Sequence, residues 1–155
     1  MIFPDTEIIF QLILATVLGL ILGVEREFIG KPAGMRTYAL VSLGAATFTI
    51  ISKYGFSDVG GGDFDPSRVA SQIVTGIGFL GAGVIIFRGV KVEGLTTASG
   101  LWVSAAIGMA VGAGMYAVAA VACVMAFIVI VILRRFDIEH WFRKEEDLPA
   151  GRQDK

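Results

Sequence analysis

Apolar residues come in long runs along the chain, and short segments between them hold most of the charges. A membrane-spanning helix needs about 17–25 mostly apolar residues. The last run, from residue 95 to residue 133, carries no charge and is too long for one helix, but Gly112-Ala113-Gly114 offers a turn within it. Dividing it there predicts five transmembrane helices, at about 7–24, 37–52, 69–87, 97–111 and 115–133. Alternating strand patterns are absent, so we expect an all-α membrane protein.

Composition supports a location in the membrane. Only 17% of the 155 residues are charged and 55% are hydrophobic, whereas a soluble domain carries about a quarter charged residues. The formal net charge of −1 gives no reason to expect a nucleic-acid partner. The single cysteine, Cys123, lies in an apolar run, which is typical of a buried, unreactive thiol. We expect one transmembrane domain over residues 1–135 and a short tail, 136–155, with an interfacial helix and a disordered end.

The basic residues indicate how the helices are oriented. With five crossings and an outside N-terminus, eleven Lys and Arg residues lie on the inner side of the membrane and two on the outer side. Cytoplasmic loops of membrane proteins carry the excess of basic residues. We therefore expect the N-terminus outside and the C-terminal tail in the cytoplasm.

Two parts of the sequence resemble each other at a spacing of 60 residues. Residues 20–46 and 80–106 share eight identities in 27 ungapped positions. This similarity predicts an internal repeat in which helices one and two correspond to helices three and four, with the fifth helix outside the repeat. Both connecting loops are expected on the cytoplasmic side, so the two halves would be parallel.

A polar segment, "EREFIGKPAGMRT", connects the first two helices, and "KVEGLTT" is its counterpart in the repeat. Together they predict the inner end of a polar cleft, which polar residues of the third helix enter from the outer side. Glu25 could pair with Arg36 or Arg26, or bind a hard cation such as Mg²⁺, and Thr37 and Thr97 are candidate N-caps. The alternative is two ordinary capped helices behind a positively charged loop. The predicted cleft residues are Glu25, Arg26, Arg36, Thr37, Arg68, Gln72, Thr96 and Thr97.

Small residues form a stripe along the predicted fourth helix, at Gly100, Ser104, Gly108 and Gly112. Residues four apart share a helix face, and small side chains allow close contact between helices in membranes. The stripe could pack against a helix of the same chain or against a second copy, and we expect a homodimer. Trp102 lies too deep for an interfacial aromatic residue, so we expect it to pack inside.

Three ordered blocks of the sequence resemble the MgtC/SapB family of bacterial inner-membrane proteins: "GVEREFIGKPAGMRTYALVSLGA", "DPSRVASQIVTGIGFLGAGVI" and "VEGLTTASGLWVSAAIGMAVGAGMY". The resemblance implies a five-helix membrane domain. It also implies roles in growth at low Mg²⁺, in survival of pathogens within host cells and in restraint of the F-type ATP synthase. Family members often carry a soluble C-terminal domain, whereas only about 20 residues follow Arg135 here.

Two classes of function remain open at this point. One is a non-enzymatic regulator that binds other membrane proteins, such as the F-type ATP synthase. The other is a transporter or ion-binding protein that uses the polar cleft, with Mg²⁺ as the candidate ion. The sequence contains no set of nucleophile, base and acid typical of an enzyme and no cofactor motif, so we do not expect an enzyme.

Overall fold

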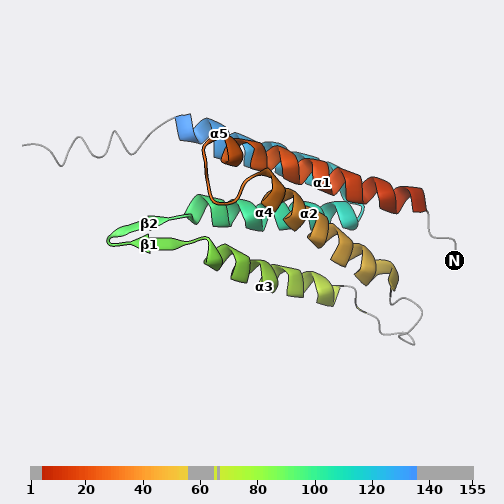
Figure 1. Ribbon diagram of the computed structural model, residues 1–155. Coiled ribbons are helices and arrows are strands. Elements are labelled where there is room, and N and C mark those ends of the chain that lie inside the picture. The colour runs from red at the N-terminus through yellow and green to blue at the C-terminus, as the bar shows by residue number, and fades with distance from the viewer. Residues whose placement is uncertain (1–4, 56–64, 66, 136–155) are drawn as a thin grey trace, which may run out of the picture.

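The computed structural model describes residues 5–55, 65 and 67–135, and most of these residues are helical (Figure 1). Each of the five segments predicted as helices contains a helix, but the third, predicted at 69–87, ends at Gly83, and its last two residues lie in a strand. The elements are α1 (Asp5–Phe28), α2 (Met35–Ile50), the π-helix η1 (Ile51–Gly55), α3 (Ser67–Gly83), β1 (Ile86–Arg88), β2 (Lys91–Glu93), α4 (Leu95–Gly112) and α5 (Tyr116–Arg135). The interfacial helix predicted within 136–155 lies outside the described residues.

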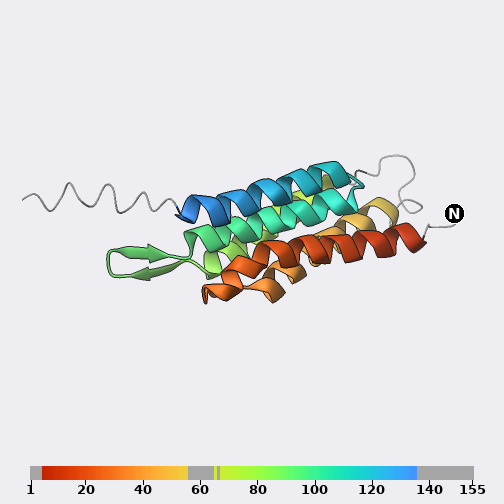
Figure 2. The ribbon, with the colours of Figure 1, turned by 90° about the horizontal axis from the view of Figure 1, so that it is seen from above.

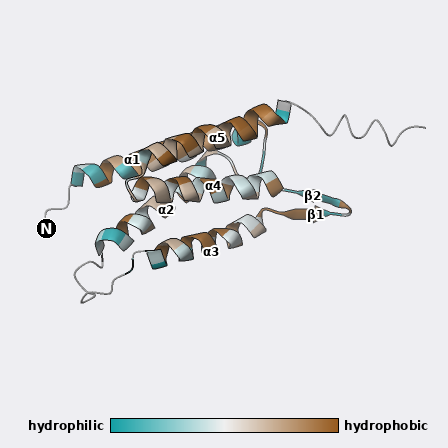
Figure 3. Cartoon of the chain, turned by 180° about the vertical axis from the view of Figure 1, so that it is seen from behind, coloured by the Kyte–Doolittle hydropathy of each residue, from teal (hydrophilic) through white to brown (hydrophobic). Residues whose placement is uncertain are grey.

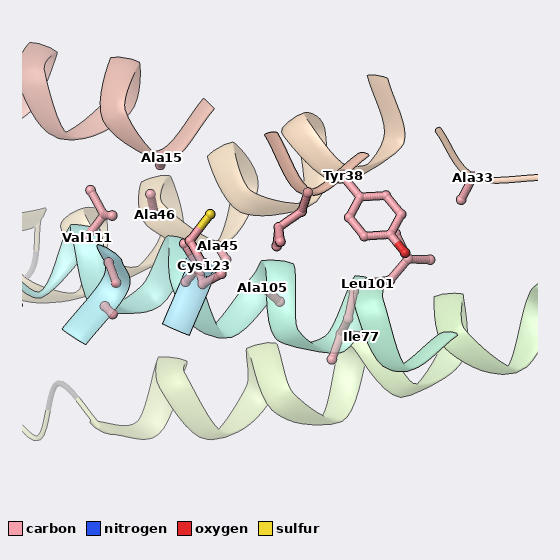
Figure 4. Close-up of a cluster of buried hydrophobic side chains, with 14 residues drawn as sticks. Ala15, Ala33, Tyr38, Ala45, Ala46, Ile77, Leu101, Ala105, Val111 and Cys123 are labelled. Carbon is pink, nitrogen blue, oxygen red and sulfur yellow. The ribbon is translucent and has the colours of Figure 1, made fainter. Parts of the chain in front are cut away.

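The helix α4 is the centre of an elongated bundle, since it packs against α1, α2, α3 and α5 (Figures 1 and 2). Consecutive helices run in opposite directions along the long axis, so the loop after α1, the hairpin and the last turn of α5 gather at one end. The residues between the helices are mostly small (Figure 4). The core includes Ala15, Ala45, Ala46, Ala105, Ala110 and Ala119 around a few larger side chains such as Tyr38 and Leu101.

The small-residue stripe of α4 faces α2 of the same chain. A Cβ atom added at Gly108 would collide with the backbone of Ser42, and one added at Gly112 would lie 2.7 Å from the carbonyl oxygen of Ala46. Gly100 meets the Tyr38 side chain in the same way. The stripe therefore packs against α2 of the same chain, and a homodimer would have to form through another surface.

The expectation that strands are absent is wrong for one short segment. β1 and β2 form an antiparallel hairpin in which Phe87 pairs with Val92 and Arg88 pairs with Lys91. Gly89 opens the two-residue connection with a φ of +61°, the sign of φ that type II′ turns need at that position. The hairpin projects beyond the ends of the helices (Figure 2).

The helices α2 and α4 begin two residues earlier than predicted. Their N-cap residues are Gly34 and Gly94, which have no side chain to accept a capping hydrogen bond. Thr37 and Thr97 lie within the first helical turn, so their prediction as N-caps is wrong. The two cap glycines are 60 residues apart, which is the spacing of the proposed repeat.

Among the described residues, three helices are long and apolar enough to cross a membrane, by length and composition: α1, α4 and α5. The helix α2 has 16 residues, but the π-helical turn η1 continues it to Gly55. The helix α3 has 17 residues. Figure 3 shows apolar residues along most of α5, and the outward side chains of α1 and α5 include Ile9, Ile13, Val121, Val124 and Val129.

The depth of Trp102 in α4 predicted that it packs inside the bundle, and this prediction is wrong. Half of the residue is exposed, and it borders a small cavity between α3 and α4 with Ile73, Ile77 and Met109. The indole therefore lies on the outer surface of the bundle, where a bilayer would surround it.

Candidate functional site

An ion-pair cluster joins the ends of α1 and α5. The guanidinium of Arg26 lies 2.5 Å from Glu25 Oε2, and Nη1 of Arg134 donates to Glu25 Oε1 at 2.7 Å. The side chains of Arg26 and Glu25 are 4% and 13% exposed. Each carboxylate oxygen thus faces one guanidinium. Of the two partners considered for Glu25, the structure selects Arg26 rather than Arg36.

Arg134 is a member of this cluster that the sequence did not identify. It lies 109 residues from Glu25 along the chain. The predicted topology could have suggested this contact. In it, one crossing ends at the end of α1 and five crossings end at the end of α5, so both helix ends lie on the same side of the membrane.

Glu27 has a separate role at the start of α2. Its Oε2 accepts a hydrogen bond from the backbone N–H of Met35 at 3.0 Å. A carboxylate is favoured at a helix N-terminus, where N–H groups lack partners. Gly34 makes room for this contact, because a Cβ atom there would overlap the Glu27 carboxylate. The polar segment is thereby folded back onto the first turn of α2.

Buried polar contacts hold α2 to α4. Ser104 Oγ donates to the carbonyl oxygen of Tyr38 at 2.8 Å, and Tyr38 Oη donates to the carbonyl oxygen of Thr97 at 3.3 Å. Thr97 and Ser104 are almost completely buried. These contacts satisfy polar groups in a region that lipid surrounds, and they fix the register of the two helices.

A groove of about 600 Å³ lies between α2 and α3, and Ala105 of α4 contributes to its floor. Arg36 and Thr37 line it near the start of α2. Gln72 lines it from α3, which runs antiparallel to α2, so that Gln72 lies toward the opposite end (Figure 1). The remaining lining is apolar or glycine: Leu40, Val41, Gly44, Ala45, Phe48, Val69, Ile73, Gly76, Ile77, Leu80 and Ala105.

The eight predicted cleft residues are thus divided among several places. Glu25 and Arg26 lie in the ion-pair cluster, and Thr97 is buried between α2 and α4. Arg36, Thr37 and Gln72 line the groove. Thr96 is exposed in the first turn of α4 and Arg68 in the first turn of α3. The functional role of these residues stays a prediction.

A second polar contact, at the opposite end of the bundle, was not predicted. Gln11 is completely buried on α1, and its Nε2 donates to Tyr116 Oη at 3.1 Å. Tyr116 Oη in turn donates to Glu7 Oε1 at 3.2 Å, and its ring meets Phe10 edge-on. This contact ties the first turns of α1 to the start of α5.

Residue Asp65 stands at the start of α3. Its Oδ1 accepts a hydrogen bond from the backbone N–H of Ser67 at 2.9 Å. Hydrogen bonding from Ser67 lowers the pKa of the Asp65 carboxyl below its ordinary value. The ionised carboxylate is the form that supports the first turn of α3.

Glu25 was also the candidate ligand for Mg²⁺. Within residues 5–55, 65 and 67–135, no group of three or more His, Cys, Asp or Glu side chains is arranged to hold a metal ion. Glu25 would have to leave one of its two arginines to bind a cation. Metal binding by Glu25 stays a prediction.

Comparison with known proteins shows that the chain belongs to the MgtC family. The profile described as the MgtC family matches residues 12–138. The chain is 51% identical to "Protein MgtC" of Brucella abortus (strain 2308) over 120 residues, which is 77% of this chain and 48% of that protein. It is 48% identical to "Putative magnesium transporter YhiD" of Escherichia coli (strain K12) over 132 residues, 83% of this chain and 61% of that protein.

A further relative is "Protein MgtC" of Salmonella typhimurium, 44% identical over 126 residues, which is 81% of this chain and 52% of that protein. The chain therefore spans about half to three-fifths of the length of these relatives. No solved structure matches the chain.

Proposed function

Because the chain belongs to the MgtC family, we propose that it is a membrane protein of Mg²⁺ homeostasis that regulates another membrane protein by binding it. The link to Mg²⁺ rests on the family and on the name of its Escherichia coli relative. The F-type ATP synthase is the partner that the family resemblance suggests. The regulation is non-enzymatic and takes place at the inner membrane.

The observation that carries this proposal is the exposed hairpin of β1 and β2. Phe87 is 74% exposed and Val90 is fully exposed, and Ile86 and Val92 are also open. Single apolar residues on a surface are common, but an apolar group on a projecting element is typical of a protein-binding site. The hairpin lies beyond the helix ends (Figure 2), and we therefore place it outside the lipid that would surround the bundle.

The hairpin also offers a means of recognition. A two-stranded ribbon has unpaired backbone groups along both outer edges, and another chain can add a strand there. Arg88 and Lys91 stand at the turn between the apolar residues. A partner with an apolar and acidic surface close to the membrane would fit both features.

The experiment is complementation of a strain that lacks this protein, during growth at low Mg²⁺. The double variant Phe87→Ser/Val90→Ser should fail to complement while its melting temperature in mild detergent stays close to that of the wild type. The matched control is Phe79→Ser, which changes a phenylalanine of α3 that is 82% exposed but outside the hairpin. Full complementation by the double variant would reject the hairpin as the partner site.

A transporter is the second candidate, favoured by the name of the Escherichia coli relative. In such a protein, Glu25 would have to exchange Arg26 or Arg134 for the ion during each cycle. Uptake of Mg²⁺ by liposomes that contain the purified protein, above that of empty liposomes, would support this candidate over the regulator.

A further inference from the structure

The groove between α2 and α3 has the length of one membrane leaflet. It extends from Arg36 to Phe48 along α2, and at 1.5 Å per residue these 12 steps cover about 18 Å. Half of the hydrocarbon core of a bilayer is about 15 Å thick. Along α2 the groove therefore covers about one leaflet from the first turn of the helix, and on α3 its lining extends from Leu80 back to Val69 in the first turn of that helix.

The chemistry of the groove changes along this length. Arg36 and Thr37 supply polar groups at the end near the start of α2, and the rest of the lining is apolar or glycine apart from Gln72, which lies toward the opposite end. The side chain of Arg36 is exposed and, within the part of the chain that the structure describes, it enters no ion pair. A cationic group above an apolar channel complements a molecule with an anionic head and a hydrocarbon chain.

The volume of the groove favours a small molecule over a helix. About 600 Å³ lies within the range of about 300–1,000 Å³ for small-molecule sites. An α-helix with its side chains is about 10–12 Å across, so 18 Å of it would occupy more than about 1,400 Å³. A helix of a partner would stand largely outside the groove.

We propose that this groove binds an anionic phospholipid, with one acyl chain between α2 and α3 and the phosphate on the Arg36 guanidinium beside the Thr37 hydroxyl. Basic residues between transmembrane helices at the cytoplasmic surface are a recurring site for anionic headgroups. The N-terminus of α2 is not the anion site, because Glu27 already accepts from the N–H of Met35. Arg36 therefore selects the headgroup, and the apolar lining holds the chain.

The test is native mass spectrometry of the full chain in mild detergent, with phosphatidylglycerol or phosphatidylcholine of identical acyl chains. The wild type should retain phosphatidylglycerol about fivefold better than phosphatidylcholine, as expected for one basic contact. Arg36→Gln should remove this preference. Equal retention of the two lipids by the wild type, or an unchanged preference in Arg36→Gln, would overturn the headgroup assignment.

Two glycine variants test the channel itself. A Cβ atom at Gly76 or at Gly78 meets nothing within 4 Å, but only Gly76 lines the groove. Gly76→Leu should lose both lipids at an unchanged melting temperature, while Gly78→Leu should retain them like the wild type. Equal lipid retention by the two variants would reject the groove as the site. Displacement of phosphatidylglycerol by inorganic phosphate would instead assign Arg36 to free phosphate and overturn the lipid proposal.

Discussion

At the scale of single residues, Glu25 joins the ends of α1 and α5 at the hairpin end of the bundle. Arg26 is almost completely buried, and its charge is balanced by Glu25 Oε2. Removal of one partner from a buried ion pair leaves an uncompensated charge, which typically costs about 3–5 kcal/mol. The amide of Glu25→Gln keeps the size of the side chain but not its charge. We expect this variant to lower the melting temperature in mild detergent clearly.

The matched control is Glu93→Gln, which removes a carboxylate from the exposed pair with Arg88 in the hairpin. Exposed pairs contribute about 0–1 kcal/mol, so this change should leave the melting temperature nearly unchanged. The double variant Glu25→Gln/Arg26→Gln should recover part of the lost stability, since no buried charge remains. A Glu25→Gln protein as stable as the wild type would show that the ion-pair cluster does not stabilise the bundle. It would then favour a functional role for Glu25.

At the scale of elements, the contact between α2 and α4 determines whether the bundle forms. Gly108 lies against the backbone of Ser42, and backbone atoms cannot move aside as a flexible side chain can. Gly108→Leu should force α2 and α4 apart, break the hydrogen bond from Ser104 to Tyr38 and prevent stable folding. The measurement is the yield of monodisperse protein in size-exclusion chromatography, with Gly78→Leu as the control. A folded Gly108→Leu protein that differs only in oligomeric state would place the stripe at an interface between copies.

The helices were predictable because each apolar run is long enough to need the backbone hydrogen bonds of a helix in lipid. The hairpin was missed because its strands have three residues each, too few to show an alternating pattern. The usable signal was Gly89-Val90 between Arg88 and Lys91, a two-residue connection that starts with glycine.

The candidate site was predictable only in part. The local sequence placed Glu25 beside Arg26, but the contact with Arg134 depends on which helix ends meet across 109 residues. Spacing along one helix also could not show that Glu27 would bind the first turn of α2 and so fold the polar segment back onto that helix. The direction of Trp102 was misjudged because depth along a helix says nothing about which side faces the bundle.

At the scale of the whole molecule, the orientation in the membrane follows from where the charges gather. The loop after α1, the hairpin and the end of α5 lie at one end of the bundle (Figure 1). These segments and the helix turns on either side of the loop contain the basic residues Arg26, Lys31, Arg36, Arg88, Lys91 and Arg134. We propose five crossings with this end in the cytoplasm. A reporter enzyme fused after Lys155 should be active only as a cytoplasmic protein.

A fusion that ends within residues 56–64 provides the opposite case, because two crossings return the chain to the outer side. Its reporter should be active only outside the cytoplasm. Cytoplasmic activity at both fusion points would mean an even number of crossings between them, so α3, α4 and α5 would not all cross the membrane and the five-crossing topology would be wrong.

The central position of α4 has a consequence for biosynthesis. The buried face of α2, with Tyr38 and Ser42, is completed only by α4, and α4 ends at Gly112 whereas α2 ends at Ile50. Ribosomes add about 5–20 residues per second, so the first two helices, which pack against each other, wait roughly 3–12 seconds in the bilayer before α4 completes their packing. During this interval the carbonyl oxygen of Tyr38 lacks its partner Ser104, and we expect the nascent chain to be open to quality-control proteases of the membrane. The packing around α2 is therefore completed late, only after the chain has been made as far as Gly112.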